Sequence, residues 1–409
     1  MELSHKNKLD PLPYWLREPL ITGKNDFPSD GEILVIGSGL AGVSSCYWLQ
    51  QNGFKNISLV DFEADKAASF RNCGHILPGT VESLSALATL HGAQVACDIW
   101  RFSEELCQNV EETAKKLAIN FDYQRRGYLV VAIDEAEDQE IQQAVTLMQQ
   151  NGFDSRYLTS SEIKKHGFKN VYGGRLDPKA ADAHPVKFRN ALIKSAVENG
   201  LNYIRPTEVL EVEEEAGRVR VQAADGRSAN FEAAVIASNA YSPLLSQYFN
   251  KHRLVEPFRG QIISSAPLRK PTAWQGPHSF DHGYEYGLYT KDNRLLLGGW
   301  RQHSSDGERG SYDLTINEKI ETGLKKFAKH HYEIDEEIHW EQSWSGIMAS
   351  SRTGLPLIGP TDSPLIYTIC GFTGHGFSWA HGSAKLLADM MAGKDLPTVA
   401  HMFDPRPRV

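Results

Sequence analysis

The stretch EILVIGSGLAG, residues 32–42, decides the fold class. Its first five residues form a short apolar run that ends in glycine, as a buried parallel strand does. The last six read G-x-G-x-x-G, and residues 43–52 have the pattern of a helix. Between a strand and a helix, such glycines allow a tight turn, close approach to a pyrophosphate and close helix packing. We therefore predict a dinucleotide site, with the phosphates at the helix N-terminus, formed by Gly37, Ser38, Gly39, Leu40, Ala41 and Gly42.

An acidic residue follows the next apolar run, residues 57–60. Asp61 stands where a carboxylate would accept the hydroxyls of the adenosine ribose, and we assign Phe62 to the same site. Glu63, two residues past the strand, is a poorer candidate that stays open. An acidic ribose partner fits FAD and NAD equally, because both carry a free 2′-hydroxyl. Only one G-x-G-x-x-G motif is present, whereas enzymes that pass hydride from NAD to flavin usually have two.

The composition bounds the class of protein. A chain of 409 residues is long enough for about two domains, and 41% apolar with 23% charged residues is ordinary for a globular protein. The net charge of -8 argues against a nucleic-acid partner. No apolar run approaches the ~18 residues of a membrane span, and the first thirty residues lack the apolar core of a signal peptide. Five cysteines without C-x-x-C or metal-ligand spacing predict free thiols, a cytoplasmic location and no metal site.

Strands and helices alternate at both ends of the chain, with a more antiparallel middle. The residues up to Asp30 are expected to pack as an irregular extension. A helical pattern over 81–117 puts Leu84, Leu87 and Leu90 on one stripe. The other expected helices lie at 159–166, 185–199, 318–330 and 376–391. The other expected strands lie at 124–133, 208–213, 219–223, 231–238, 257–264, 288–289, 295–298 and 365–369.

Two further glycine-rich segments stand far apart in the chain, SFRNCGHILPG at 69–79 and GFTGHGF at 371–377. Between them lie VIASNAY (235–241), RGQ (259–261), RLLLGG (294–299) and GLPLIGP (354–360). From about residue 32 to residue 393, these motifs resemble in order those of the D-amino-acid oxidase-like FAD superfamily. The similarity is greatest to its sarcosine oxidase, glycine oxidase and gamma-glutamylputrescine oxidase-like branch. Each motif alone is modest, but seven in register are specific.

The resemblance implies FAD as the cofactor, with the first loop beside the flavin ring and the strand around Val209 over the adenosine. A helix beginning near Gly376 would stabilise the negative charge of the reduced flavin with its free N–H groups and dipole. His375 either holds its loop or lies beside the ring. The cofactor residues implied in this way are Arg71, Asn72, Cys73, Gly74, His75, Val209, Gly346, Gly374, His375, Gly376 and Phe377.

Three departures from the family pattern limit what it implies. Cys73 replaces a glycine of the R-N-G-G motif. The cysteine that tethers the flavin in sarcosine oxidases matches Gly346 here, so we expect FAD to be bound non-covalently. The lysine that pairs with the substrate carboxylate in sarcosine oxidases matches Ser378. We therefore expect sarcosine and glycine to be poor substrates and a longer or less acidic amine to be preferred.

The family oxidises a C–N bond by hydride transfer to flavin, giving an imine that water hydrolyses. The resemblance thus predicts an amine or amino-acid substrate, with oxygen as electron acceptor. The alternatives are a dehydrogenase that uses another acceptor and a flavin-binding subunit with little activity of its own. No catalytic base is required by this chemistry, and we predict none. The substrate-pocket candidates are aromatic or cationic residues of the middle segment: His282, Tyr284, Tyr286, Arg301, Trp344 and Arg352.

The predicted fold class is α/β, with a Rossmann-type FAD-binding domain interleaved with an antiparallel α+β substrate domain. The two glycine-rich ends of the sequence must meet on one cofactor, so the domains cannot simply follow one another. We expect the FAD-binding domain to take residues 1–85, 172–245 and 345–409. The substrate domain would take residues 86–171 and 246–344. The oligomeric state is not predicted.

Overall fold

The computed structural model describes residues 9–28 and 30–407, so the prediction for the first residues lies partly outside the described part of the chain. An eight-stranded mixed sheet contains a parallel core of β18, β11, β1, β2 and β8, which confirms the predicted α/β class. In this sheet Val35 pairs with Leu59 on one side and with Val235 on the other. The strands are β1 (Asp30–Ile36), β2 (Ile57–Val60), β8 (Asn202–Ile204), β9 (Val209–Glu215), β10 (Arg218–Ala223), β11 (Ser228–Ile236), β17 (Leu357–Pro360) and β18 (Ile366–Cys370).

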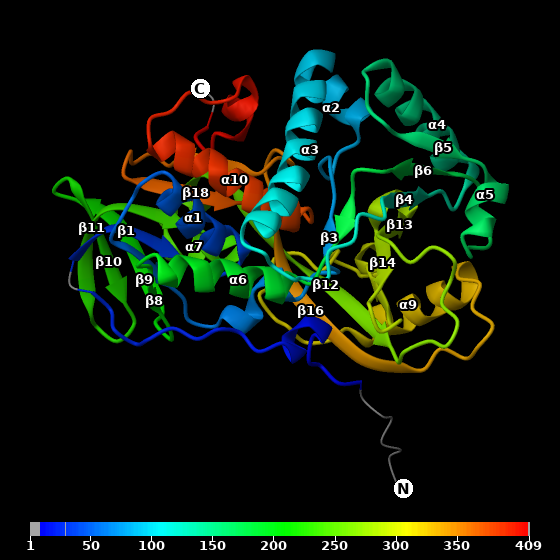
Figure 1. The fold of residues 1–409 in the computed structure, drawn as a ribbon, viewed down its shortest axis with the longest axis horizontal. Coiled ribbons are helices and arrows are strands. Elements are labelled where there is room, and N and C mark those ends of the chain that lie inside the picture. The colour runs from blue at the N-terminus through cyan, green and yellow to red at the C-terminus, as the bar shows by residue number, and fades with distance from the viewer. Residues whose placement is uncertain (1–8, 29, 408–409) are drawn as a thin grey trace, which may run out of the picture.

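The second half of β1, residues 33–36, is apolar because it is buried on both faces. Ile33 and Val35 pack against the helices of one face, and Leu34 and Ile36 pack against the β9–β10 hairpin and the ends of β12 and β16. In Figure 1 the helix α10, near the C-terminus, lies beside α1, near the N-terminus. The helices are α1 (Leu40–Gln51), α2 (Leu84–His91), α3 (Ala93–Lys116), α4 (Glu135–Gln150), α5 (Ser160–Lys165), α6 (Pro185–Glu198), α7 (Ser242–Leu245), α8 (Gln247–His252), α9 (Glu318–His331) and α10 (Gly376–Met391).

A second eight-stranded sheet is mainly antiparallel and lies to the right of the first in Figure 1. Its two longest strands, β12 and β16, pair over their whole lengths and reach from the core of the second sheet to that of the first. The strands, in spatial order, are β16 (Trp340–Ser351), β12 (Val255–Ser265), β15 (Leu295–Gly298), β14 (Glu285–Tyr289), β13 (His278–Phe280), β4 (Tyr128–Val131), β6 (Gly174–Asp177) and β5 (Arg156–Leu158). A small third sheet pairs β3 (His75–Ile76) with β7 (Ala181–Asp182).

Among the elements that were predicted, two differ most from the structure. The helical pattern over 81–117 is broken at Gly92, which has φ +86° and separates α2 from α3. Leu90 is 63% exposed, so the predicted stripe continues only through Leu84 and Leu87. The strand expected over 124–133 is shorter: β4 spans Tyr128–Val131, and Gln124 forms only an isolated bridge with Asp182. No helix of the described residues is long and apolar enough to cross a membrane.

Candidate functional site

A cavity of about 2040 Å³ opens at the carboxyl ends of β1, β2 and β11, where ligands bind in open α/β sheets. Residues from both glycine-rich ends of the sequence and from the second sheet line the same cavity. Pockets for drug-sized ligands usually measure about 300–1,000 Å³. This cavity is therefore large enough for a dinucleotide together with a small substrate.

Most of the residues predicted from the sequence line this cavity. They are Gly37, Gly39, Leu40, Ala41, Asp61, Phe62, Arg71, Asn72, Cys73, His75, Val209, Gly346, Gly374, His375, Gly376, Phe377, His282, Tyr284, Tyr286, Arg301 and Arg352. Four predicted residues do not: Ser38, Gly42, Gly74 and Trp344. These four lie behind the cavity wall, and each supports a residue that does line it.

The turn at residues 37–42 leaves no room for a side chain at position 42. A Cβ at position 42 would lie 1.8 Å from the carbonyl oxygen of Gly37, so only glycine lets α1 start this close to β1. The Leu40 N–H already donates to Ser69 Oγ at 2.9 Å. The N–H groups of Ala41 and Gly42 have no acceptor among the described residues. Ala41 lines the cavity, so its N–H is free to bind an anion there, at the positive end of the helix dipole.

Asp61 projects from the end of β2 into the cavity, and its Oδ2 accepts a hydrogen bond from the Ser38 N–H at 2.5 Å. Burial raises the pKa of this carboxyl group, while the Ser38 donor and the charges of Arg189 and Arg205 act in the opposite direction. The carboxylate is thus fixed by the glycine turn, and its other oxygen remains an acceptor for a ligand hydroxyl.

The sequence analysis missed a buried arginine that braces this turn from behind. Arg189 on α6 is fully buried and donates to the carbonyl oxygen of Ser38 at 3.2 Å, to Ser38 Oγ at 3.0 Å and to Tyr203 Oη at 2.7 Å. The only signal in the sequence is an arginine within the otherwise apolar stripe of this helix, beside Phe188 and Leu192.

The C-terminal loop brings the start of α10 to the other part of the cavity. His375 is the residue immediately before α10, lines the cavity, and its Nδ1 lies 3.5 Å from the Thr373 carbonyl oxygen. The histidine therefore both holds its loop and contacts the cavity. Burial lowers its pKa, so the ring is neutral. The free N–H groups of the first turn of α10 offer a second site for negative charge.

The loop at residues 71–75 presents mainly backbone to the cavity, because its polar side chains bind the protein itself. Arg71 donates to the carbonyl oxygens of Asp65 (2.9 Å) and Ser345 (2.8 Å). Asn72 Nδ2 donates to the Ser69 carbonyl, and its Oδ1 accepts from the Gly74 N–H at 2.7 Å. Burial raises the pKa of the Cys73 thiol, which disfavours the thiolate.

His75 is a neutral group at the cavity wall. Its Nε2 lies 3.0 Å from the Gly287 carbonyl oxygen, which can only accept, so Nε2 carries the proton and Nδ1 is an acceptor. Burial lowers its pKa to about 3. The ring therefore stays uncharged throughout the neutral pH range.

An arginine without an acidic partner faces the opposite end of the cavity. The guanidinium of Arg301 lies 4.8 Å from the ring centre of Phe258 and 5.3 Å from that of Tyr284. Within the described chain it forms no ion pair, and its hydrogen bond to the Gly307 carbonyl is long, at 3.5 Å. Tyr284 thus already offers its face to a cation of the protein. Arg352, by contrast, is exposed at the rim.

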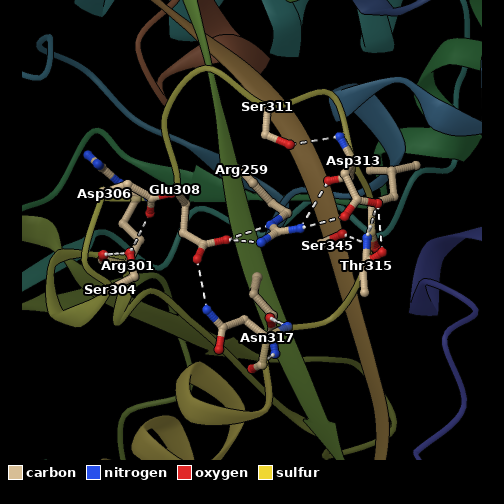
Figure 2. Close-up of polar contacts among 12 residues, drawn as sticks. Arg259, Arg301, Ser304, Asp306, Glu308, Ser311, Asp313, Thr315, Asn317 and Ser345 are labelled. Atoms are coloured by element: carbon tan, nitrogen blue, oxygen red, sulfur yellow. Dashed lines mark hydrogen bonds and ion pairs between the residues drawn. The ribbon is translucent and has the colours of Figure 1, made fainter.

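The segment that follows Arg301 is anchored on β12 by the arginine of the RGQ motif. Figure 2 shows the Arg259 side chain between Glu308 and Asp313, and both form ion pairs with it. The Arg259 N–H also donates to the Glu308 carbonyl at 2.8 Å. Gln261 Oε1 accepts from the Asn317 N–H at 2.9 Å. The motif therefore fixes residues 301–317 along the edge of the strand that carries it.

A group of acidic residues lies behind the Arg301 end of the cavity. Gln302 Nε2 donates to Glu285 Oε1 at 2.7 Å and to Asp281 Oδ2 at 3.0 Å. Burial, with Asp281 nearby, raises the pKa of Glu285 to about 7. Potential ligand atoms of Asp281, Glu285 and His303 lie within 4.8 Å of one another, a spacing that would admit a cation, but the amide of Gln302 already binds both carboxylates.

These donors and acceptors fit the parts of a flavin dinucleotide. The free N–H groups of α1 suit a pyrophosphate, Asp61 suits the ribose, and the start of α10 suits the electron-rich part of the flavin. An apolar ligand would not pair with the free N–H groups, and a smaller ligand would not reach both the start of α1 and the start of α10.

Comparison with known proteins gives the same cofactor. The model of the family DAO, FAD dependent oxidoreductase, matches residues 32–390. The probable oxidoreductase OrdL of Haemophilus influenzae is 24% identical over 369 residues, covering 89% of this chain and 83% of that protein. A D-amino acid dehydrogenase of Rhizobium johnstonii is 25% identical, covering 88% and 96%. The structure of glycine oxidase from Geobacillus kaustophilus superposes with a TM-score of 0.79 at 19% identity, covering 93% of this chain and all of that one.

Proposed function

We propose that this chain, which belongs to the DAO family of FAD dependent oxidoreductases, oxidises the C–N bond of an amino acid larger than glycine. The observation that carries the proposal is Arg301, a cation in the same cavity as the glycine turn of α1. A relative of this chain acts as a D-amino acid dehydrogenase, and a structurally similar protein is a glycine oxidase.

The cofactor end of the cavity would hold FAD in an extended form. The N–H group of Ala41, at the cavity wall, would bind the pyrophosphate, and Asp61 the ribose. When bound, FAD supplies the acceptor for the hydride of the substrate. The first turn of α10 would stabilise the charge that follows, since its N–H groups need not reorganise. The protein's task is to place the substrate and exclude bulk water.

Arg301 supports a substrate that bears a carboxylate. A partly buried cation without an acid partner is unfavourable, and a ligand carboxylate would complete the pair with two parallel hydrogen bonds. The rings of Phe258 and Tyr284 hold the guanidinium in place. Ser378, which matches the lysine of sarcosine oxidases, is buried and donates to the Leu77 carbonyl at 2.8 Å. The carboxylate would thus be held by an arginine of the second sheet, and not at the start of α10.

His75 supports the oxidation of an amine without a charged base. Because its ring is neutral, it adds no positive charge that would repel an ammonium group, and its Nδ1 can accept a hydrogen bond from the substrate nitrogen. The substrate nitrogen must be neutral when the hydride leaves, and an acceptor of low basicity orients it without retaining the proton.

We also propose that FAD is bound non-covalently, that the two domains are interleaved in the sequence, and that the protein is cytoplasmic. The five cysteines are free and buried, and burial raises the pKa of Cys73, the one that lines the cavity. A thiol that stays protonated is a poor nucleophile toward flavin. Non-covalent FAD should therefore leave the protein on acid precipitation.

An anaerobic flavin-reduction screen tests the function directly. Each N-substituted or longer amino acid is compared with the amine that lacks its carboxylate. We expect the acid to reduce the flavin faster, and Arg301→Ala to slow that reaction about 100-fold, the loss of ~2.7 kcal/mol. The amine should be unaffected. Arg301→Lys should recover part of the rate, and Arg352→Ala, at the exposed rim, serves as the matched control. Equal rates for acid and amine in all variants would contradict the proposal, and admitting oxygen then distinguishes an oxidase from a dehydrogenase.

A further inference from the structure

Two tryptophans lie behind the 71–75 loop and donate to consecutive carbonyl oxygens of its backbone. Trp344 Nε1 donates to the Arg71 carbonyl at 3.1 Å, and Trp15 Nε1 donates to the Asn72 carbonyl at 2.7 Å. Both indoles are buried, and neither lines the cavity. The loop is thus held from the side away from the cavity by two indole N–H groups.

This arrangement fixes the direction of two backbone donors. In a trans peptide the N–H points opposite to the C=O. The peptide whose oxygen Trp344 binds has the N–H of Asn72, and the peptide whose oxygen Trp15 binds has the N–H of Cys73. Asn72 and Cys73 line the cavity, and neither N–H has an acceptor among the described residues. Asn72 is half-buried and Cys73 is buried, and N–H groups that the protein itself leaves unpaired at a cavity wall are available to a ligand acceptor.

The side chains of this loop cannot supply the same donors. The Arg71 guanidinium binds two carbonyl oxygens, and the Asn72 amide is used within the loop. Cys73 is a buried thiol. The loop therefore offers its backbone to the cavity, and the position of that backbone depends on what holds its carbonyl groups.

Trp15 belongs to the N-terminal segment, which is itself held by several hydrogen bonds to the rest of the protein. Gln342 Nε2 donates to the Leu12 carbonyl at 2.7 Å, and Tyr14 Oη donates to Asp292 Oδ1 at 2.7 Å. The Trp15 ring fits against Gly74, where a Cβ would lie 2.9 Å from Trp15 Cζ2. The segment before β1 is therefore a fitted part of the wall behind the loop.

We propose that Trp15 and Trp344 are positioning residues that aim the N–H groups of Asn72 and Cys73 at an electron-rich atom of the bound FAD. The inference rests on the placement of FAD in this cavity proposed above. Two fixed donors stabilise a reduced, more negative flavin more than an oxidised one. The N-terminal segment thereby sets the redox behaviour of a cofactor that it does not touch.

The test compares Trp15→Phe and Trp344→Phe, which keep the ring and remove the N–H, with Trp274→Phe. The Trp274→Phe variant also loses an indole hydrogen bond, which Trp274 donates to the Pro277 carbonyl at 3.2 Å. Trp274 neither lines the cavity nor contacts the loop. The flavin midpoint potential, the flavin absorption spectrum and the melting temperature are measured for each holoprotein. We expect the two loop variants to shift the potential to more negative values and to change the spectrum, and Trp274→Phe to change neither.

The inference is overturned if Trp15→Phe lowers the melting temperature but leaves potential and spectrum as in the wild type, because Trp15 would then be structural only. Should Trp344→Phe fail to fold, Trp15→Phe alone decides. The variant Gly39→Val tests separately whether FAD binds in this cavity. If that variant also kept full flavin content, FAD would not occupy this cavity and the proposed function would fail first.

Discussion

The two ends of the cavity are built by different means. At the cofactor end, backbone N–H groups and glycines from single short segments form the surface, and Asp61 is fixed by a neighbouring turn. At the Arg301 end, side chains from β12, the β13–β14 turn and the segment after β15 meet across long stretches of sequence. Local backbone geometry leaves a sequence motif, whereas a site assembled from distant side chains does not. The first end is therefore specific for a cofactor, and the second is free to vary with the substrate.

The largest expected effect is at the glycine turn. Gly42→Ala places a Cβ 1.8 Å from the Gly37 carbonyl oxygen, and backbone cannot yield as a flexible side chain can. We expect a loss of at least about 3 kcal/mol in the free energy of unfolding, together with loss of bound FAD. Thermal melting and flavin content measure both. Gly376→Ala, whose nearest neighbour would be the Phe372 side chain at 3.7 Å, is the control and should stay folded. Normal stability of Gly42→Ala would show that the turn is not as tight as described.

The second-largest effect is expected at the Asp61 carboxylate, and it should be confined to the binding of FAD. Asp61→Ala removes a charged acceptor, a loss of about 1.5–3 kcal/mol or roughly 10–100-fold in the FAD dissociation constant. Glu63 also lines the cavity but is paired with Lys66 at the surface, so Glu63→Ala should bind FAD normally. Fluorescence titration of apoprotein with FAD measures the constants. If Glu63→Ala proved the weaker binder of the two, the ribose partner would have been assigned to the wrong residue.

At the other end, the anchor of residues 301–317 should affect substrate binding and spare the cofactor. Arg259→Ala removes the ion pair of the buried Glu308, which keeps only its hydrogen bond from Asn317, and loosens the segment that carries Arg301. We expect KM for a carboxylate substrate to rise about tenfold, or ~1.4 kcal/mol, with FAD affinity unchanged. Steady-state kinetics with acid and amine substrates separates the two effects, and Arg259→Lys should lose less. An equal loss for the amine would mean that the segment does not act through Arg301.

The smallest effect is a pH dependence of stability at the Arg301 end. Burial raises the pKa of Glu285 to about 7, above the 4.5 of an exposed glutamate. The folded protein therefore holds this proton more tightly, and its contribution to stability falls as the pH rises from about 4.5 to about 7. Glu285→Gln should remove this slope and be more stable above pH 7 by on the order of 1 kcal/mol. Urea unfolding at pH 5 and pH 8 measures the difference. An unchanged slope would mean that Glu285 ionises at its ordinary pKa.

The same contrast explains how much could be predicted from the sequence. The parallel core, the glycine turn and α10 are local patterns, and the structure has them within a few residues of the expected bounds. Helix α4 is absent from the predicted elements, although Asp134 caps it and Ile141, Ala144, Val145 and Met148 form a helical stripe. That signal was available in the sequence.

Other features could not be predicted because they depend on tertiary contacts. Strand β16 is rich in serine and lacks alternation, and it is a strand because it pairs along the whole of β12 and is buried there. Trp344, expected in the substrate pocket, is buried behind the 71–75 loop. Tyr284, also expected in the substrate pocket, lines the cavity, but its ring face is occupied by Arg301. In each case the partner comes from a distant segment that no local pattern identifies.

A crystal structure of the protein with FAD and a non-reactive carboxylate analogue tests most directly whether one cavity joins both ends. We expect the adenosine ribose at Asp61, the pyrophosphate at the start of α1, and the flavin ring between the 71–75 loop and the start of α10. The carboxylate of the analogue should pair with the Arg301 guanidinium between Phe258 and Tyr284. A flavin bound in this way with the carboxylate held elsewhere would contradict the assignment of the substrate end. A flavin outside this cavity would contradict the account of both ends.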